Sequence, residues 1–180
     1  MNVLITPRLT MRPPAMPDAE DIALWLSDCN VARMLGTVPH PYRLSDAFDW
    51  IASVTGDPSR MVYTIHRERL IGVVSLEGDP ARPRLGYWLA SRWHGRGFMT
   101  EAADALLAHA FATRDIDAVS SSVFTDNPAS LRVQLKLGFL VTGVGEAFSR
   151  ARNAGIEKWL THLAPASFAG AGHHETRSAA

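Results

Sequence analysis

One stretch constrains the fold more than any other: residues 85–111, which read LGYWLASRWHGRGFMTEAADALLAHAF. Its apolar, aromatic start predicts a strand that ends near Ala90. A helix is expected next, because apolar residues recur at the i, i+3, i+4 spacing of one helical face: Met99, Ala102, Ala103, Leu106, Leu107, Ala110 and Phe111. The strand and the helix are therefore joined by a short turn, which contains Gly95 and Gly97.

The turn between this strand and this helix has the composition of an anion site. Glycine lets a backbone approach a ligand closely. The first turn of a helix presents amide hydrogens without intrahelical partners at the positive end of the helix dipole. Together these properties favour a phosphate or pyrophosphate, and Arg92 and Arg96 add positive charge. A tight turn with no ligand is the alternative interpretation of two glycines by themselves.

The whole-chain composition limits the classes of partner. A chain of 180 residues fits one domain with a substantial core. Lys plus Arg and Asp plus Glu both total 18, so the formal net charge is zero, which argues against nucleic acid as a partner. The single cysteine, Cys29, suits a reducing compartment and is expected to be a buried apolar residue. The first residues, MNVLITPRLTMRPP, lack the basic start and the apolar run typical of a signal peptide, and no stretch has about 20 apolar residues, so we predict a cytoplasmic protein without membrane contact.

The order of the expected elements indicates the α/β (α+β) class. Strands are expected at residues 3–12, 61–66, 70–76, 85–89, 118–124, 139–144 and 156–163. Helices are expected at residues 18–27, 30–35, 45–54 and 99–111, and between Asn127 as N-cap and Gly138. These elements make a mostly antiparallel, mixed sheet with helices on both faces. Residues 1–164 are predicted to form the domain, and residues 165–180, which are small and polar, a disordered tail.

Two motifs resemble those of a known family. The first is Arg92-x-x-Gly95-x-Gly97, which follows the strand and runs into Met99-Thr100-Glu101-Ala102. The second is Asn127-Pro128-Ala129-Ser130, followed by Lys136-Leu137-Gly138-Phe139. Both are similar to motifs of the GCN5-related N-acetyltransferases (GNAT), in particular the branch that includes the ribosomal-protein N-terminal acetyltransferases. The family's order of elements matches residues 4–163, nearly the whole chain.

The resemblance implies how acetyl-CoA would be held. The two central strands would splay at their carboxyl ends, so that pantetheine enters as a pseudo-strand, and the pyrophosphate would lie on residues 94–98. The implied cofactor-binding residues are Trp88, Leu89, Arg92, His94, Gly95, Arg96, Gly97, Phe98, Met99 and Asn127. One backbone amide at Trp88 or Leu89 would stabilise the oxyanion. No metal is implied.

The catalytic acid departs from the common family pattern. Many GNAT enzymes have a tyrosine that protonates the thiolate seven residues after the motif asparagine, where this chain has Gln134. In the branch it resembles, a serine is suggested for this role, which is Ser130 here. A hydroxyl in the first turn and the helix dipole both favour a developing thiolate. The structural alternative is that Asn127 is only an N-cap and Ser130 an ordinary first-turn residue.

The general base is left open by the sequence. A glutamate common in this branch just before the central strand is replaced by Arg84, and the substitutes Glu77, Asp79 and Glu146 are equally explained as solvated acids. An α-amine with a pKa of about 7.7–8 is partly neutral at cellular pH, whereas a lysine amine at about 10.4 is not. A weak base therefore favours, by a small margin, α-amino groups or other weakly basic amines as acceptors.

The sequence predicts an N-acetyltransferase that moves an acetyl group from acetyl-CoA to a primary amine, on a protein N-terminus or a small molecule. The alternative is a non-catalytic acyl-CoA-binding sensor of the same fold. A dinucleotide oxidoreductase is excluded, because Thr100 stands in place of a third glycine, and Asp115 and Asp117 precede their strand instead of ending it. Residues 30–42 and 145–155 are expected to shape the acceptor pocket, and a monomer or a homodimer is expected.

Overall fold

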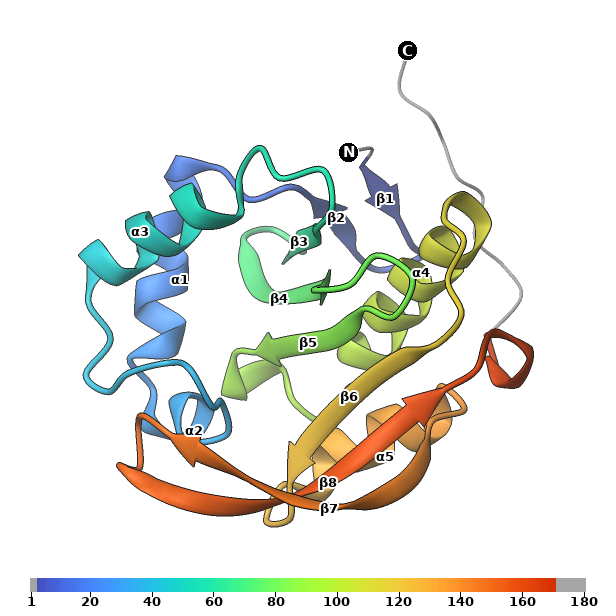
Figure 1. Ribbon diagram of the computed structural model, residues 1–180. Helices are drawn as coiled ribbons and strands as arrows, with labels where there is room; N and C mark the ends of the chain where they lie inside the picture. Colours follow the sequence, from blue (N-terminus) through green and yellow to red (C-terminus); the bar gives the residue numbers. More distant parts are fainter. Residues whose placement is uncertain (1–2, 171–180) are drawn as a thin grey trace.

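The computed structural model describes residues 3–170, which form one eight-stranded sheet with helices on both faces (Figure 1). The sheet order is β1-β2-β3-β4-β5-β6-β8-β7, and only the β5–β6 pair in this described sheet is parallel. The strands are β1 Leu4–Ile5, β2 Thr10–Arg12, β3 Met61–His66, β4 Leu70–Glu77, β5 Arg84–Leu89, β6 Val119–Phe124, β7 Leu140–Ser149 and β8 Ala154–Leu163. The helices are α1 Ala19–Leu26, α2 Cys29–Ala32, α3 Leu44–Val54, α4 Phe98–Thr113 and α5 Pro128–Lys136. The predicted fold class is confirmed.

Alternation along the strands sends apolar side chains into cores on both faces of the sheet. On one face, Leu106 and Leu107 of α4 share a core with Tyr63 of β3, and all three are fully buried. On the other face, α1 and α3 cover the sheet, and Val54 of α3 packs with Val62 of β3. The central strands are therefore packed on both faces. This packing holds in place β5 and β6, the strands that line the site.

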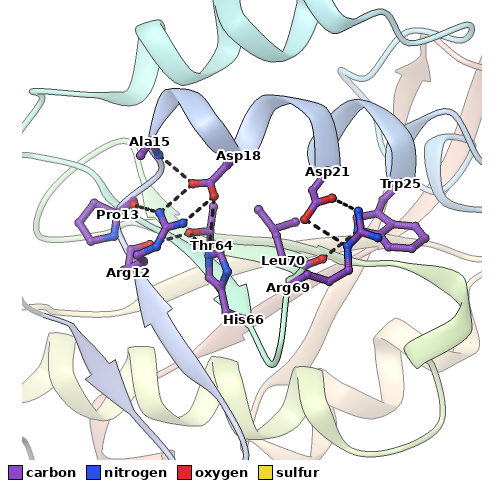
Figure 2. Close-up of polar contacts among 10 residues, drawn as sticks. All are labelled: Arg12, Pro13, Ala15, Asp18, Asp21, Trp25, Thr64, His66, Arg69 and Leu70. Atoms are coloured by element: carbon purple, nitrogen blue, oxygen red, sulfur yellow. Dashed lines mark hydrogen bonds and ion pairs between the residues drawn. The ribbon is translucent and has the colours of Figure 1, made fainter.

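Polar contacts hold α1 on the sheet (Figure 2). Arg12 of β2 donates from its two terminal nitrogens to the Asp18 carboxylate at 2.8 and 2.6 Å. Farther along α1, Asp21 pairs with Arg69 of the β3–β4 turn, and Trp25 donates to the first carbonyl of β4 at 2.9 Å. Asp18 occupies the N-cap position of α1 but makes no side-chain cap hydrogen bond, because its carboxylate binds Arg12 and the preceding turn instead.

The sheet opens between β5 and β6, which share one ladder pair, Arg84 with Ser120. β5 remains paired with β4 along its whole length, and β6 remains paired with β8. Beyond Arg84 the two strands therefore diverge, as Figure 1 shows. The splay that the family resemblance implies is confirmed.

Three local predictions are wrong. The strand expected at residues 3–12 is a short hairpin of β1 and β2, because the Thr6 amide bonds to the Leu9 carbonyl at 2.9 Å and reverses the chain. The connector expected at residues 145–155 is mostly strand, because β7 and β8 pair as far as Ser149 and Ala154, and this pairing overrides weak local propensity. Cys29 is exposed, since it begins the short helix α2 at the surface.

The end of the described chain packs against the domain. Residues 165–170 belong to the tail predicted to be disordered, and they contain a 3-10 turn at Pro165–Ser167. The Phe168 ring lies 5.4 Å from the Phe111 ring of α4, centroid to centroid. Residues 171–180 of the predicted tail lie outside the described residues, and the domain boundary at residue 164 stays a prediction.

Candidate active site

A cavity of about 940 Å³ lies where β5 and β6 splay. Residues 84–89 of β5 and 121–124 of β6 line its two sides. The turn before α4 and the first turn of α5 line it on one face of the sheet, and residues of the segment 30–37, together with Phe148 of β7, line it elsewhere. The segments expected to shape an acceptor pocket therefore border the same cavity as both sequence motifs.

The structure gathers most of the predicted site residues around this cavity. Those that line it are Trp88, Leu89, His94, Gly95, Gly97, Phe98, Met99, Asn127 and Ser130. Arg92 and Arg96 lie outside the described lining, and their guanidinium groups stack 5.5 and 5.4 Å from the ring centroid of Trp93. Phe98 and Met99 are only 4% and 7% exposed. These two residues thus offer a ligand mainly their backbone.

The turn before α4 has the backbone that its glycines predict. Gly95 and Gly97 have φ of +73° and +78°, the left-handed region that side-chain-bearing residues rarely adopt. A Cβ on Gly95 would meet no atom within 4 Å, so the dihedral alone favours glycine there. Gly97 is the N-cap of α4 and has no side chain to cap the first-turn amides. The turn therefore has the features of an anion site.

The start of α5 brings together two hydroxyl groups. Asn127 is the N-cap, and its Oδ1 accepts from the Ser130 amide at 3.1 Å, so its structural role is confirmed. The Ser130 hydroxyl lies 2.8 Å from the hydroxyl of Tyr87, which also lies 3.1 Å from the Ser130 carbonyl oxygen. Burial raises the pKa of Tyr87, against hydrogen bonds with Ser130 and Gln134 that lower it. The phenol therefore stays protonated at neutral pH.

Gln134 has a structural role at the position where many family members have a tyrosine. It is 1% exposed, donates to the Ser121 hydroxyl at 3.0 Å and accepts from the Thr161 hydroxyl at 2.7 Å. It thereby joins α5 to β6 and β8. Tyr87 is the site residue that the sequence analysis missed. The sequence predicts that Tyr87 lies in the central strand, but its contact with Ser130 depends on how α5 packs beside that strand.

The described lining of the cavity offers no unpaired carboxylate. Glu77, Asp79 and Glu146, the candidate bases, do not belong to the lining that residues 3–170 provide. Asp126 does, but its carboxylate accepts from both terminal nitrogens of Arg152, at 2.7 and 3.1 Å. The hydrogen bond from Arg152 lowers the pKa of Asp126, although burial opposes it. Asp126 is therefore ionised and engaged in an ion pair at neutral pH.

Arg152, in the turn between β7 and β8, also contacts the segment after α2, whose residues 34–37 line the cavity. Its Nε donates to the Arg33 carbonyl at 2.6 Å, and the Arg33 side chain pairs with Asp126 at 3.3 Å. Nearby, the Arg150 amide donates to the Gly36 carbonyl at 3.0 Å. We call residues 33–37 and 150–152 the rim. These contacts fix the turn between β7 and β8 against the segment after α2, so the rim is preformed.

The comparisons with known proteins decide the family. The family model described as an acetyltransferase (GNAT) domain matches residues 8–140. The chain belongs to the GNAT family. This GNAT protein is 25% identical over 179 residues to an uncharacterized N-acetyltransferase, p20, of Bacillus licheniformis, covering 94% of this chain and 100% of that protein. It is 30% identical over 88 residues to the ribosomal-protein-serine acetyltransferase of Escherichia coli (strain K12), covering 47% and 49% of the two chains.

A solved structure shows the same fold. It is the microcin C7 self immunity acetyltransferase MccE in complex with acetyl-CoA and AMP, with a TM-score of 0.76 at 20% identity, covering 88% of this chain and 93% of that chain. The GNAT protein is thus an acyltransferase of the N-acetyltransferase class, as the sequence predicted, and this supports an enzyme over a sensor. No helix within residues 3–170 is both long and apolar enough to cross a membrane. The cytoplasmic location stays a prediction.

Proposed function

We propose that this GNAT enzyme transfers the acetyl group of acetyl-CoA to a primary amine in the cavity between β5 and β6. The observation that carries the proposal is the convergence of three features on one cavity: the glycine turn, the splayed strands and the Ser130 hydroxyl. We assign the side of the cavity formed by the glycine turn and α5 to acetyl-CoA, and the side formed by the rim to the amine. The two substrates then approach the splay by different routes.

The cofactor is proposed to lie along β5 and the turn that follows it. The pyrophosphate binds the amides of residues 94–98, where both glycines are left-handed. Pantetheine runs beside β5, on the edge that faces the splay. Ala90 donates to Ile71 of β4 at 2.9 Å, so strand alternation turns the backbone of Leu89 toward the splay and that of Trp88 toward β4.

Two side chains support this placement. His94 Nε2 lies 2.7 Å from the Leu89 carbonyl oxygen, so it donates to that oxygen and leaves the Leu89 amide for a ligand. Asn127 uses its Oδ1 as the cap of α5, which leaves its amide NH₂ to donate to the CoA arm. Arg92 and Arg96 contribute long-range positive charge, since their guanidinium groups stack on Trp93.

The proposed reaction begins when a neutral amine attacks the thioester carbonyl carbon. The oxyanion of the tetrahedral intermediate accepts a hydrogen bond from the Leu89 amide. The C–S bond then breaks, and the thiolate takes a proton from Ser130, which is replenished by Tyr87 at 2.8 Å. The amine gives its proton to water, and Tyr87 regains one from solvent. An α-amine suits this scheme, because a substantial fraction is neutral near pH 7.7–8.

The acceptor is proposed to be a protein N-terminus or a small-molecule amine. The Escherichia coli relative, named a ribosomal-protein-serine acetyltransferase, supports a protein as one class of acceptor. The oligomeric state, monomer or homodimer, stays a prediction.

Binding and turnover together test the proposal. Millimolar acetyl-CoA should raise the melting temperature, because a ligand of the native state stabilises it by mass action, and NAD should not. Release of free thiol should then depend on an added amine. If acetyl-CoA gives neither heat in calorimetry nor a thermal shift, the proposal is wrong. If it binds but no amine accelerates thiol release, the sensor interpretation replaces the enzyme mechanism.

A further inference from the structure

Lys158 of β8 lines the cavity near the rim. It is the ladder partner of Phe124 in β6 and of Gly145 in β7, so its side chain leaves the sheet on the same face as the Phe124 ring. The guanidinium group of Arg152, a rim residue, lies 5.0 Å from the centroid of that ring. The Lys158 ammonium group is therefore on the rim side of the sheet.

Lys158 is a half-buried cation without a partner. Within residues 3–170 its ammonium group makes no hydrogen bond and no ion pair. Asp126, the acidic residue of the described lining, is already bound by Arg152 and Arg33. A partly desolvated charge without a counter-ion is unfavourable. A carboxylate on a bound ligand would relieve this cost by a charge-assisted hydrogen bond.

The charges near the rim set the preferred ligand. Arg33, Arg150, Arg152 and Lys158 contribute four positive charges, and Asp126 contributes one negative charge that is already paired. The local field is therefore positive, although the net charge of the whole chain is zero. A ligand with additional positive charges is repelled there, and a ligand with a negative charge is attracted.

We infer that the acceptor of this enzyme carries an acidic group close to its amine, and that Lys158 binds that group. The inference rests on the proposed function, because it takes the rim as the entrance for the amine. The acidic group is a carboxylate, which has two sources: a free acidic amino acid, or a peptide with Asp or Glu directly after its first residue. Polyamines are poor acceptors.

The test compares acceptors on the full chain with acetyl-CoA, by thiol release. The acceptors are the peptides Ser-Asp-Glu-Ala-Ala, Ser-Ala-Ala-Ala-Ala and Ser-Lys-Lys-Ala-Ala, together with free aspartate and spermidine. The better of the two acidic acceptors should exceed the neutral peptide in kcat/KM by roughly tenfold, mainly through KM, as one charge-assisted hydrogen bond allows. The basic peptide and spermidine should rank lowest. The order of the acidic peptide and aspartate identifies the source of the carboxylate.

Variants assign the effect to one side chain. Lys158→Met should abolish the preference for acidic acceptors, Lys158→Glu should reverse it, and Lys158→Arg should retain it. Arg82→Met is the charge-matched control, because Arg82 pairs with Asp117 at the surface and lies outside the described lining. It should keep the preference. Circular dichroism should show that all variants are folded.

A binding measurement separates this inference from the proposed function. Calorimetry with CoA-saturated protein compares the acidic and neutral peptides without turnover, and the acidic peptide should bind roughly tenfold more tightly. Tighter binding without turnover of any amine would overturn the proposed function and support the inference. Equal affinity and equal kcat/KM for acidic and neutral acceptors would overturn the inference. A preference that survives in Lys158→Met would also overturn it.

Discussion

Gly72 of β4 sets how closely β5 approaches, and therefore where the backbone of β5 lies in the cavity. It is the ladder partner of Leu89, and a Cβ at Gly72 would lie 2.4 Å from the Trp88 carbonyl oxygen and 3.1 Å from the Leu89 Cα. Ordinary contact begins at 3.4 Å, so Gly72→Ala requires a shift of about 1 Å. β4 is held by β3 on its other side, whereas β5 faces the open splay. We expect β5 to move, and Leu89 to shift farther into the cavity that it lines.

The expected consequences are measurable in stability and in rate. Overpacking of this kind costs about 1–3 kcal/mol, and each kcal/mol lowers Tm by roughly 2–4 °C for a chain of this size. A displacement of about 1 Å in the group that holds the oxyanion costs about 10²-fold in kcat/KM. Thiol release gives the rate, and thermal unfolding followed by circular dichroism gives Tm.

A strand glycine with room for a methyl group is the control. A Cβ on Gly143 of β7 would have its nearest foreign atom, the Leu160 Cδ1, at 3.9 Å. Gly143→Ala should therefore keep near-normal kcat/KM. If Gly72→Ala is folded and its kcat/KM lies within twofold of the wild type, the position of the β5 backbone does not set the reaction geometry, and the reasoning fails.

Further substitutions test the two ends of the cavity and the core. Gly97→Val should leave the protein folded but remove the thermal shift caused by acetyl-CoA, since φ there is +78° and the turn must admit a phosphate; an unchanged affinity in calorimetry would exclude this turn as the pyrophosphate site. Ser130→Ala should lower kcat by about 10²-fold at unchanged acetyl-CoA affinity, the low end for a general acid. Tyr87→Phe should lower kcat by about tenfold and add little in the Ser130→Ala background, because the two hydroxyls act in series; strictly additive effects would contradict the relay. Tyr63→Phe should not change kcat and should raise the free energy of unfolding by about 1 kcal/mol in urea, since the buried Tyr63 hydroxyl has no partner among the described residues; a clear loss of stability would show that it has one.

Local chemistry explains which parts of the site the sequence could predict. Gly95 and Gly97 adopt the left-handed backbone that a turn into a helix requires, and Asn127 caps α5 in the predicted way. Each of these features depends on residues a few positions apart, so it can be predicted from a short stretch of sequence. The apolar spacing of α4 is local in the same sense, and its face is buried as expected except at Phe111, which is only partly buried.

Contacts between distant segments explain what the sequence could not predict. Tyr87 and Ser130 are 43 residues apart, and their hydroxyls meet because α5 docks beside β5. Arg152 reaches a carbonyl 119 residues earlier in the chain. The extended pairing of β7 with β8 likewise depends on the ladder between them and not on the polar residues within it. Such features follow from packing, which a pattern along one chain does not specify.

The single ladder pair between Arg84 and Ser120 also divides the hydrogen-bonded ladder of the sheet into two halves. Strands β1 to β5 form one continuously hydrogen-bonded half, and β6, β8 and β7 form the other. A molecule that lies in the splay and bonds to both inner edges acts as the absent strand and joins the halves mechanically. Amide hydrogens of the two halves should then exchange with separate protection factors in the free protein and with a common one in the complex. A ligand bound between β5 and β6, where the hydrogen-bonded ladder is interrupted, should therefore increase the rigidity of the sheet more than a ligand bound elsewhere.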